Sequence, residues 1–174
     1  MTLIVSDNSP LNLLIRIDWA EVLPALFQRI VIPTEVAAEM AHPKAPSEVR
    51  AFIAAPPTWL DIQIPATRLL LPHLDPAEAS AINLAVEMGA ALLIDELDGR
   101  HEAQARGLIV IGAIGVLERA ADSGFIPDLA AAHARIRSLR FHIADSILNA
   151  SLQRHHTRMA QTQIPTPAEP GNGI

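Results

Sequence analysis

The chain of 174 residues contains no cysteine and no tyrosine, and it has only four phenylalanines and two tryptophans. The absence of cysteine excludes disulfides, thiolate zinc sites and cysteine nucleophiles. Because aromatic residues are scarce, the core must be built from Leu, Ile, Val and Ala. No apolar run approaches the roughly 18 residues of a membrane span, so we expect a cytoplasmic protein without membrane attachment.

Positive charge is also scarce, because Lys44 is the only lysine and the net charge is −6. This balance argues against nucleic-acid binding through a broad basic surface. It does not exclude a nuclease, since carboxylates that hold metal ions also make the charge negative. The chain lacks the Gly-x-Ser-x-Gly and Gly-x-Gly-x-x-Gly motifs, which argues against a serine hydrolase and a dinucleotide cofactor.

Short apolar runs alternate with helical patterns along the chain. This alternation predicts a mainly parallel sheet with helices on both faces, a three-layer α/β/α fold. We expect one domain over residues 1–154 and, from its proline-rich composition, a disordered tail over 155–174. The predicted strands lie at residues 2–6, 29–32, 59–64, 91–94 and 108–111. The predicted helices begin with one that starts at residue 10 and has an apolar face to residue 15, and continue at residues 19–27, 33–40, 47–53, 75–88, 98 or 99 to 107, 112–121, 127–138 and 143–153.

Two of the predicted strands are followed directly by an aspartate. Asp7 follows Leu3–Ser6, and Asp95 follows Ala91–Ile94. In open α/β sheets, ligands bind at the carboxyl ends of the strands, so we expect both side chains at one edge. An anionic pair in a cleft costs free energy unless a cation or a proton compensates it. A divalent metal ion is the simplest compensation.

Asp7 and two further candidate acids, Glu39 and Glu78, can each be explained by a structural role that involves no metal ion. Asp7 fits a turn before a helix that Ser9 would cap. Glu39 lies near the negative end of its helix, where a carboxylate is mildly unfavourable, but a solvated surface position also explains it. Glu78 fits a capping box with Asp75. Spacing alone does not choose between these roles.

Three acids crowd the turn after the strand at 91–94. Asp95, Glu96 and Asp98 repel one another unless a cation or Arg100 offsets their charge. Metal binding explains this cluster. A turn paired with Arg100, in which Asp98 caps the next helix, explains it equally well.

Five segments, taken in order, resemble the PIN-domain nucleases, and among these the bacterial and archaeal VapC-type toxins. The segments are Ser6–Leu11, Val31–Val36 leading to Glu39, Leu74–Ala85, Leu92–Arg100 and Gly107–Leu117. Their order and spacing over residues 3–152 are more specific than any one of them. The resemblance implies a doubly wound parallel sheet and a carboxylate site that holds Mg²⁺ or Mn²⁺ and hydrolyses RNA.

Carried over residue by residue, the resemblance implies a catalytic set made of Asp7, Glu39, Glu78 and Asp95. The implied metal ligands are Asp7, Glu78, Asp95 and Asp98. Ser9 matches the small hydroxyl residue after the first aspartate, and Ser9 and Arg100 are expected substrate contacts. The resemblance also implies a toxin that pairs with a small antitoxin and forms a homodimer.

The chain departs from the pattern of the family at two places. Ala77 stands where relatives often have glycine, and Ile94-Asp95-Glu96 replaces a common Thr-x-Asp pattern. The last ligand therefore stays open between Asp95, Glu96 and Asp98. The rival hypothesis is a non-catalytic PIN-like binding module whose acids are only structural.

Overall fold

A single parallel sheet organises the part of the chain that the computed structural model describes, residues 3–68 and 71–162. Its strand order is β3-β2-β1-β4-β5, and every neighbouring pair is parallel. The strands are β1 (Leu3–Ser6), β2 (Arg29–Pro33), β3 (Leu60–Gln63), β4 (Ala91–Leu93) and β5 (Val110–Ile111). The predicted fold class is confirmed. β3 lies at one edge of the sheet, and three of its four residues are at least partly exposed.

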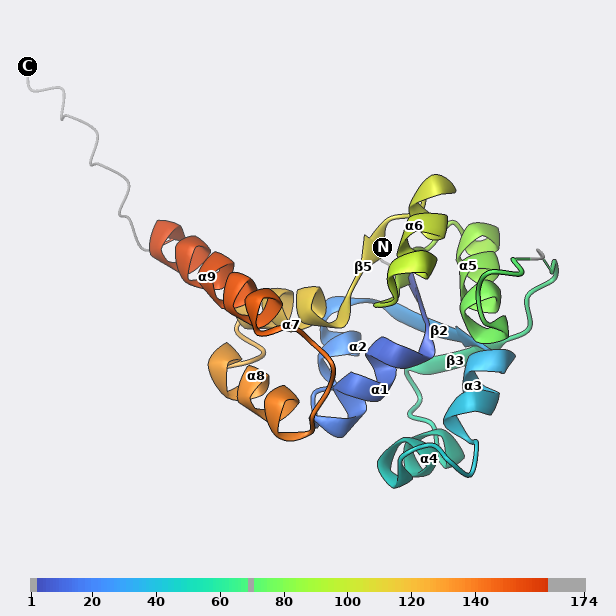
Figure 1. Ribbon diagram of the computed structural model, residues 1–174, viewed down its shortest axis with the longest axis horizontal. Coiled ribbons are helices and arrows are strands. Elements are labelled where there is room, and N and C mark those ends of the chain that lie inside the picture. The colour runs from blue at the N-terminus through green and yellow to red at the C-terminus, as the bar shows by residue number, and fades with distance from the viewer. Residues whose placement is uncertain (1–2, 69–70, 163–174) are drawn as a thin grey trace, which may run out of the picture.

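Helices connect successive strands and cover both faces of the sheet (Figure 1). One face is covered by α5, which contacts β1, β2 and β4, and by α6 beside it. On the other face, α1 and α2 both contact α7. The bounds are α1 (Asn8–Arg16), α2 (Val22–Leu26), α3 (Thr34–Met40), α4 (Ser47–Ala54), α5 (Pro76–Met88), α6 (Leu97–Ala105), α7 (Ala113–Asp122), α8 (Leu129–Ser138) and α9 (Asp145–Thr162). Within the described residues, no helix combines the length and apolar character needed to cross a bilayer.

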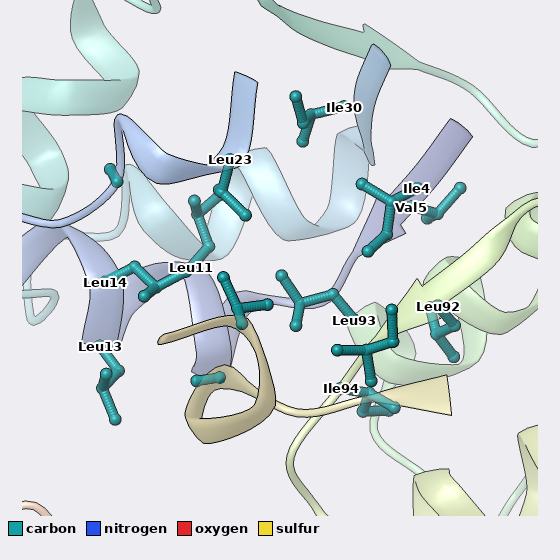
Figure 2. Close-up of a cluster of buried hydrophobic side chains, with 14 of the residues drawn as sticks. Ile4, Val5, Leu11, Leu13, Leu14, Leu23, Ile30, Leu92, Leu93 and Ile94 are labelled. Atoms are coloured by element: carbon teal, nitrogen blue, oxygen red, sulfur yellow. The ribbon is translucent and has the colours of Figure 1, made fainter. Parts of the chain in front are cut away.

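The core is aliphatic and lies against both faces of the central strands. Figure 2 shows side chains from β1, β2, β4, α1 and α2 gathered in one cluster. Ile4, Val5, Leu92 and Leu93 have no exposed surface, as expected for strands that are covered on both sides. Burial of this kind is the main stabilising contribution, at roughly 25 cal/mol per Å² of apolar surface. It fixes the ends of β1 and β4 side by side.

The starts of α1 and α2 differ from those that the sequence suggests. Asp7, and not Ser9, is the N-cap of α1, because β1 ends at Ser6 and the Asp7 carboxylate accepts the Ser9 N–H. The helix expected over residues 19–27 is restricted to α2, since the chain after α1 turns through Asp18 with a φ of 60°.

The expected disordered tail is wrong for residues 155–162, which form the last turns of α9. These turns pack along α7 and extend away from the sheet (Figure 1). Asp122 of α7 accepts hydrogen bonds from His155 at 2.6 Å and from Arg158 at 2.7 Å. Such long-range contacts hold the helix where local composition does not predict one. Residues 163–174 of the expected tail lie outside the described residues.

Candidate active site

The candidate acids gather around the point where the strand order reverses. From β1 the chain proceeds to β2 and β3 on one side, and β4 and β5 lie on the other side. Ser6 is in register with Leu93, and the Asp7 N–H donates to the Leu93 carbonyl at 2.9 Å. Asp7 and Asp95 therefore leave adjacent strands at the same edge. Such a switch point is where open α/β sheets bind ligands.

Asp7 is a buried carboxylate with few compensating contacts. It is 2% exposed, and its Oδ2 accepts the Ser9 N–H at 3.3 Å. Burial raises the pKa of Asp7 to about 7, against the lowering effect of the Asn8 and Ser9 N–H groups and with a further increase from the charge of Glu78. The ionised form is therefore costly in the folded protein, and a nearby cation would stabilise it.

Glu39 comes to the edge from α3 and is held by a neighbour of Asp7. The Asn8 amide Nδ2 donates to Glu39 Oε2 at 3.1 Å. Partial burial raises the pKa of Glu39, and the Asn8 contact lowers it. Glu35, one turn earlier, instead accepts from Ser80 of α5 at 2.7 Å. Of the two glutamates of α3, Glu39 is therefore the one that is linked to Asp7.

Glu78 has the capping role that its spacing predicts. The Asp75 carboxylate accepts the N–H groups of Ala77 and Glu78, both at 2.9 Å, and Glu78 Oε2 accepts the Asp75 N–H at 3.3 Å. This confirms the capping box. Glu78 is nevertheless only 7% exposed, and burial followed by the charge of Asp75 raises its pKa. Glu78 therefore takes part in capping α5, and its negative charge also raises the pKa of Asp7.

Asp95 is oriented by the first turn of α7. Its Oδ1 accepts the Ala113 N–H at 2.9 Å, where the positive end of the helix favours an anion. Burial raises the pKa of Asp95, while the Ala113 N–H and the charge of Arg100 lower it. The backbone approaches closely here, because a Cβ on Gly112 would lie 2.9 Å from Asp95 Oδ1 and 3.1 Å from Arg100 Nη1. Only glycine leaves both side chains in place.

The other two members of the acidic turn point to solvent. Glu96 is the N-cap residue of α6, without a side-chain hydrogen bond, and Asp98 lies in the first turn. The expectation that Asp98 caps this helix is wrong, because α6 already begins at Leu97. Both acids are exposed. Arg100 donates from Nη1 to the Ile94 carbonyl at 2.9 Å, which places its guanidinium beside Asp95.

A cleft of about 1010 Å³ opens beside Asp95. Three of the predicted site residues, Ser9, Asp95 and Arg100, line it, whereas Asp7, Glu39, Glu78 and Asp98 are not among its lining residues within the described parts of the chain. Residues that the sequence interpretation missed complete the lining. They are Asn8, Asn12, Arg119, Phe141, His142, Ile143, Ile147 and Arg154, with Leu97 and apolar residues of α1, β5 and α7. Glu96, which the sequence leaves open as the last ligand, lines the cleft too.

The donor set suits a hard divalent cation. Carboxylate oxygens are the ligands that Mg²⁺ and Mn²⁺ prefer, and burial raises the pKa of both Asp7 and Asp95, in Asp95 against the lowering effect of the Arg100 charge. Among residues 3–68 and 71–162, no three acidic or histidine side chains lie close enough to hold a metal ion together. Mg²⁺ does not require three protein ligands, because it keeps several waters and binds through one or two carboxylates and substrate phosphate.

The chain belongs to the PIN-domain family, because the family model DUF3368, described as a PIN domain, matches residues 3–157. PIN domains are typically nucleases. A solved structure with the same fold is a PilT N-terminus domain protein from the hyperthermophilic archaeon Sulfolobus solfataricus P2. It is 16% identical, with a TM-score of 0.52, and the match covers 68% of this chain and 93% of that one. No curated protein matches the chain.

Proposed function

We propose that this PIN domain is a divalent-metal-dependent ribonuclease that hydrolyses phosphodiester bonds in RNA. The observation that supports it is the placement of Asp7 and Asp95 at the ends of adjacent strands, at the switch point and next to an open cleft. Two further acids, Glu39 and Glu78, come from α3 and α5, and all four carboxyl groups have a raised pKa.

Asp7 and Asp95 are the proposed metal ligands, with Glu78 next to them. A divalent ion bound there would activate a water and offset the charge of the scissile phosphate. Asp95 keeps Oδ2 available because the α7 N-terminus engages only Oδ1. Glu39, held by Asn8, has the raised pKa that suits a group orienting or deprotonating water near neutral pH.

Arg100 is proposed to contact the substrate phosphate. It lines the cleft beside Asp95, and its hydrogen bond to the Ile94 carbonyl fixes the guanidinium there. A guanidinium has five N–H donors, so this bond leaves others for a phosphate. Ser9, in the first turn of α1, lines the same cleft and is the second proposed contact.

We further propose that the protein is the toxin of a toxin–antitoxin pair and binds a small antitoxin protein. This part rests on the resemblance of the chain to VapC-type toxins. Expression in a bacterial host should arrest growth, and Asp7→Asn should relieve the arrest at equal protein level. Size-exclusion chromatography would test the homodimer that the same resemblance implies.

The alternative is a PIN-like binding module without catalysis. It is favoured by the hydrogen bonds that already occupy the acids, since Glu78 belongs to the capping box of α5 and Asp95 accepts the Ala113 N–H at the start of α7. In that case the carboxylates would only stabilise helix starts. Replacing the aspartates by asparagine separates a helix-capping role from a metal-binding role, because Asn is a good helix cap but a poor ligand for a divalent cation.

The test is cleavage of a panel of RNAs with Mg²⁺ or Mn²⁺ by the purified protein and by Asp7→Asn and Asp95→Asn. Asp61→Asn is the matched control, since Asp61 lies on the edge strand β3, away from the candidate site, and pairs with Arg29 of β2. The nuclease hypothesis predicts metal-dependent cleavage that only the first two variants lose. Cleavage that survives in both would refute this assignment.

A further inference from the structure

The two sides of the cleft differ in chemistry. The side formed by the end of β4 and the start of α6 carries Asp95, Glu96, Leu97 and Arg100, and so all of the acids in the lining. Another side is formed by the segment after α8 and by α9, and we call it the C-terminal wall: Phe141, His142, Ile143, Ile147 and Arg154. Arg119 of α7 lines the cleft as well. Apolar and cationic groups therefore face the cleft from this side, although the whole chain is acidic.

The C-terminal wall is fixed in place by contacts outside the cleft. Glu118, buried in α7, accepts from Arg154 Nε at 3.1 Å and from Nη2 at 2.7 Å, and it also accepts from Arg158. The Arg16 guanidinium lies 4.7 Å from the centre of the Phe141 ring, within the range of a cation–π contact. The wall is thus a preformed surface, and a ligand bound to it would not first have to order it.

Two arginines on this side have donors to offer. Glu118 engages two of the five N–H donors of Arg154, so Arg154 is held by a buried carboxylate and keeps three donors. Arg119 is exposed, and none of the acidic side chains in residues 3–68 and 71–162 forms an ion pair with it. Arginine suits phosphate because its planar fork donates two parallel hydrogen bonds.

We propose that the C-terminal wall, together with Arg119, binds the substrate strand as single-stranded RNA. The two arginines contact its phosphates, and Phe141, Ile143 and Ile147 contact its bases. A duplex turns its bases inward, so only an unpaired strand presents base faces to apolar side chains next to phosphate ligands. This inference rests on the proposed function, because it assigns the surface that would hold the RNA.

The salt dependence of RNA binding tests the two kinds of contact separately. All variants carry Asp7→Asn so that the RNA stays intact, and fluorescence anisotropy reports the affinity for a short labelled RNA at several salt concentrations. The slope of log K against log salt is negative, and each lost phosphate contact on a single strand lowers its magnitude by about 0.7. We expect this decrease for Arg119→Gln and for Arg154→Gln. The matched control is Arg50→Gln, on the exposed surface of α4, which should leave the slope unchanged.

Apolar contacts release no counterions, so their loss has a different signature. Ile147→Ala should weaken binding by roughly fivefold to tenfold, the value expected when the burial of about one or two methylene groups is lost, at an unchanged slope. Ile64→Ala is the matched control, because Ile64 is 73% exposed, compared with 51% for Ile147, and is not part of the cleft lining. A duplex of the same sequence should bind more weakly than the single strand.

The outcomes separate this inference from the function on which it rests. If wild type cleaves RNA but the cleft variants bind with the affinity and slope of their controls, the C-terminal wall is not the RNA surface and the nuclease proposal still holds. Equal affinity for duplex and single strand would overturn the single-strand assignment. If the protein neither cleaves nor binds any RNA, the proposed function fails, and this inference fails with it.

Discussion

Replacing Asp7 by asparagine should stabilise the metal-free protein at neutral and alkaline pH. Burial raises the pKa of Asp7 from 3.8 to about 7, so above that pH the folded state contains an ionised carboxylate that it disfavours. At 1.36 kcal/mol per pKa unit, this difference amounts to about 4 kcal/mol. Asparagine removes the charge and keeps an oxygen that can accept the Ser9 N–H, so α1 remains capped.

The sign of the pH dependence follows from proton binding in the two states. Below pH 3.8 both the folded and the unfolded chain hold the proton, and Asp7 costs nothing. Between 3.8 and about 7 the unfolded chain releases the proton and the folded protein keeps it, so the stability of wild type falls relative to the variant as the pH rises. Urea unfolding of both proteins in a chelator at pH 4, 6 and 8 measures this difference.

The reasoning would be refuted by a variant that is less stable than wild type at pH 8, or by a difference that does not change between pH 4 and pH 8. Addition of Mn²⁺ provides a second comparison. A cation beside Asp7 favours the ionised form, so wild type should gain more stability from Mn²⁺ than the variant does. Equal gains would show that the ion binds elsewhere.

Three further substitutions test other parts of the structure. Gly112→Ala should lower RNA cleavage by ~10²-fold, because the new Cβ would displace Asp95, and it should change thermal stability little. Unchanged activity would show that the placement of Asp95 is unimportant. Glu118→Gln should lower the free energy of unfolding by roughly 2 kcal/mol at pH 7, because the arginines of α9 lower the pKa of Glu118 to about 2 and so stabilise its carboxylate. This contribution is present above pH 4.5 and disappears as the pH falls toward 2. A stability difference between the two proteins that persists in acid would contradict the ion-pair explanation. Asp98→Asn should cleave RNA about as fast as wild type, because Asp98 is exposed in the first turn of α6, and a large loss would return it to the metal site.

Local sequence signals predict the elements around the candidate site well. Asp75 and Glu78 predict the start of α5, and Gly89 predicts its end, where the structure has a left-handed φ of 58°. The apolar runs before Asp7 and Asp95 predict buried strands, and both are confirmed. These features depend on neighbouring residues, which is why they can be read without the fold.

The C-terminal side of the cleft could not be predicted in this way. Arg154 and Ile147 reach the cleft only because α9 packs on α7, and the contact of Arg154 with Glu118 spans 36 residues of sequence. The same long-range contacts explain why α9 continues through residues where a disordered tail is expected. For the cap of α1, Asp7 and Ser9 are both suitable residues, and the end of β1 decides between them.

A titration of Mn²⁺ into the metal-free protein tests the central claim most directly, with the signal of free Mn²⁺ in electron paramagnetic resonance as the readout. The proposal predicts that wild type and Asp61→Asn bind the ion, that Asp7→Asn and Asp95→Asn lose this binding, and that Mg²⁺ competes for the same site. Binding of equal strength by all four proteins, or by none of them, would contradict a metal site formed by the ends of β1 and β4.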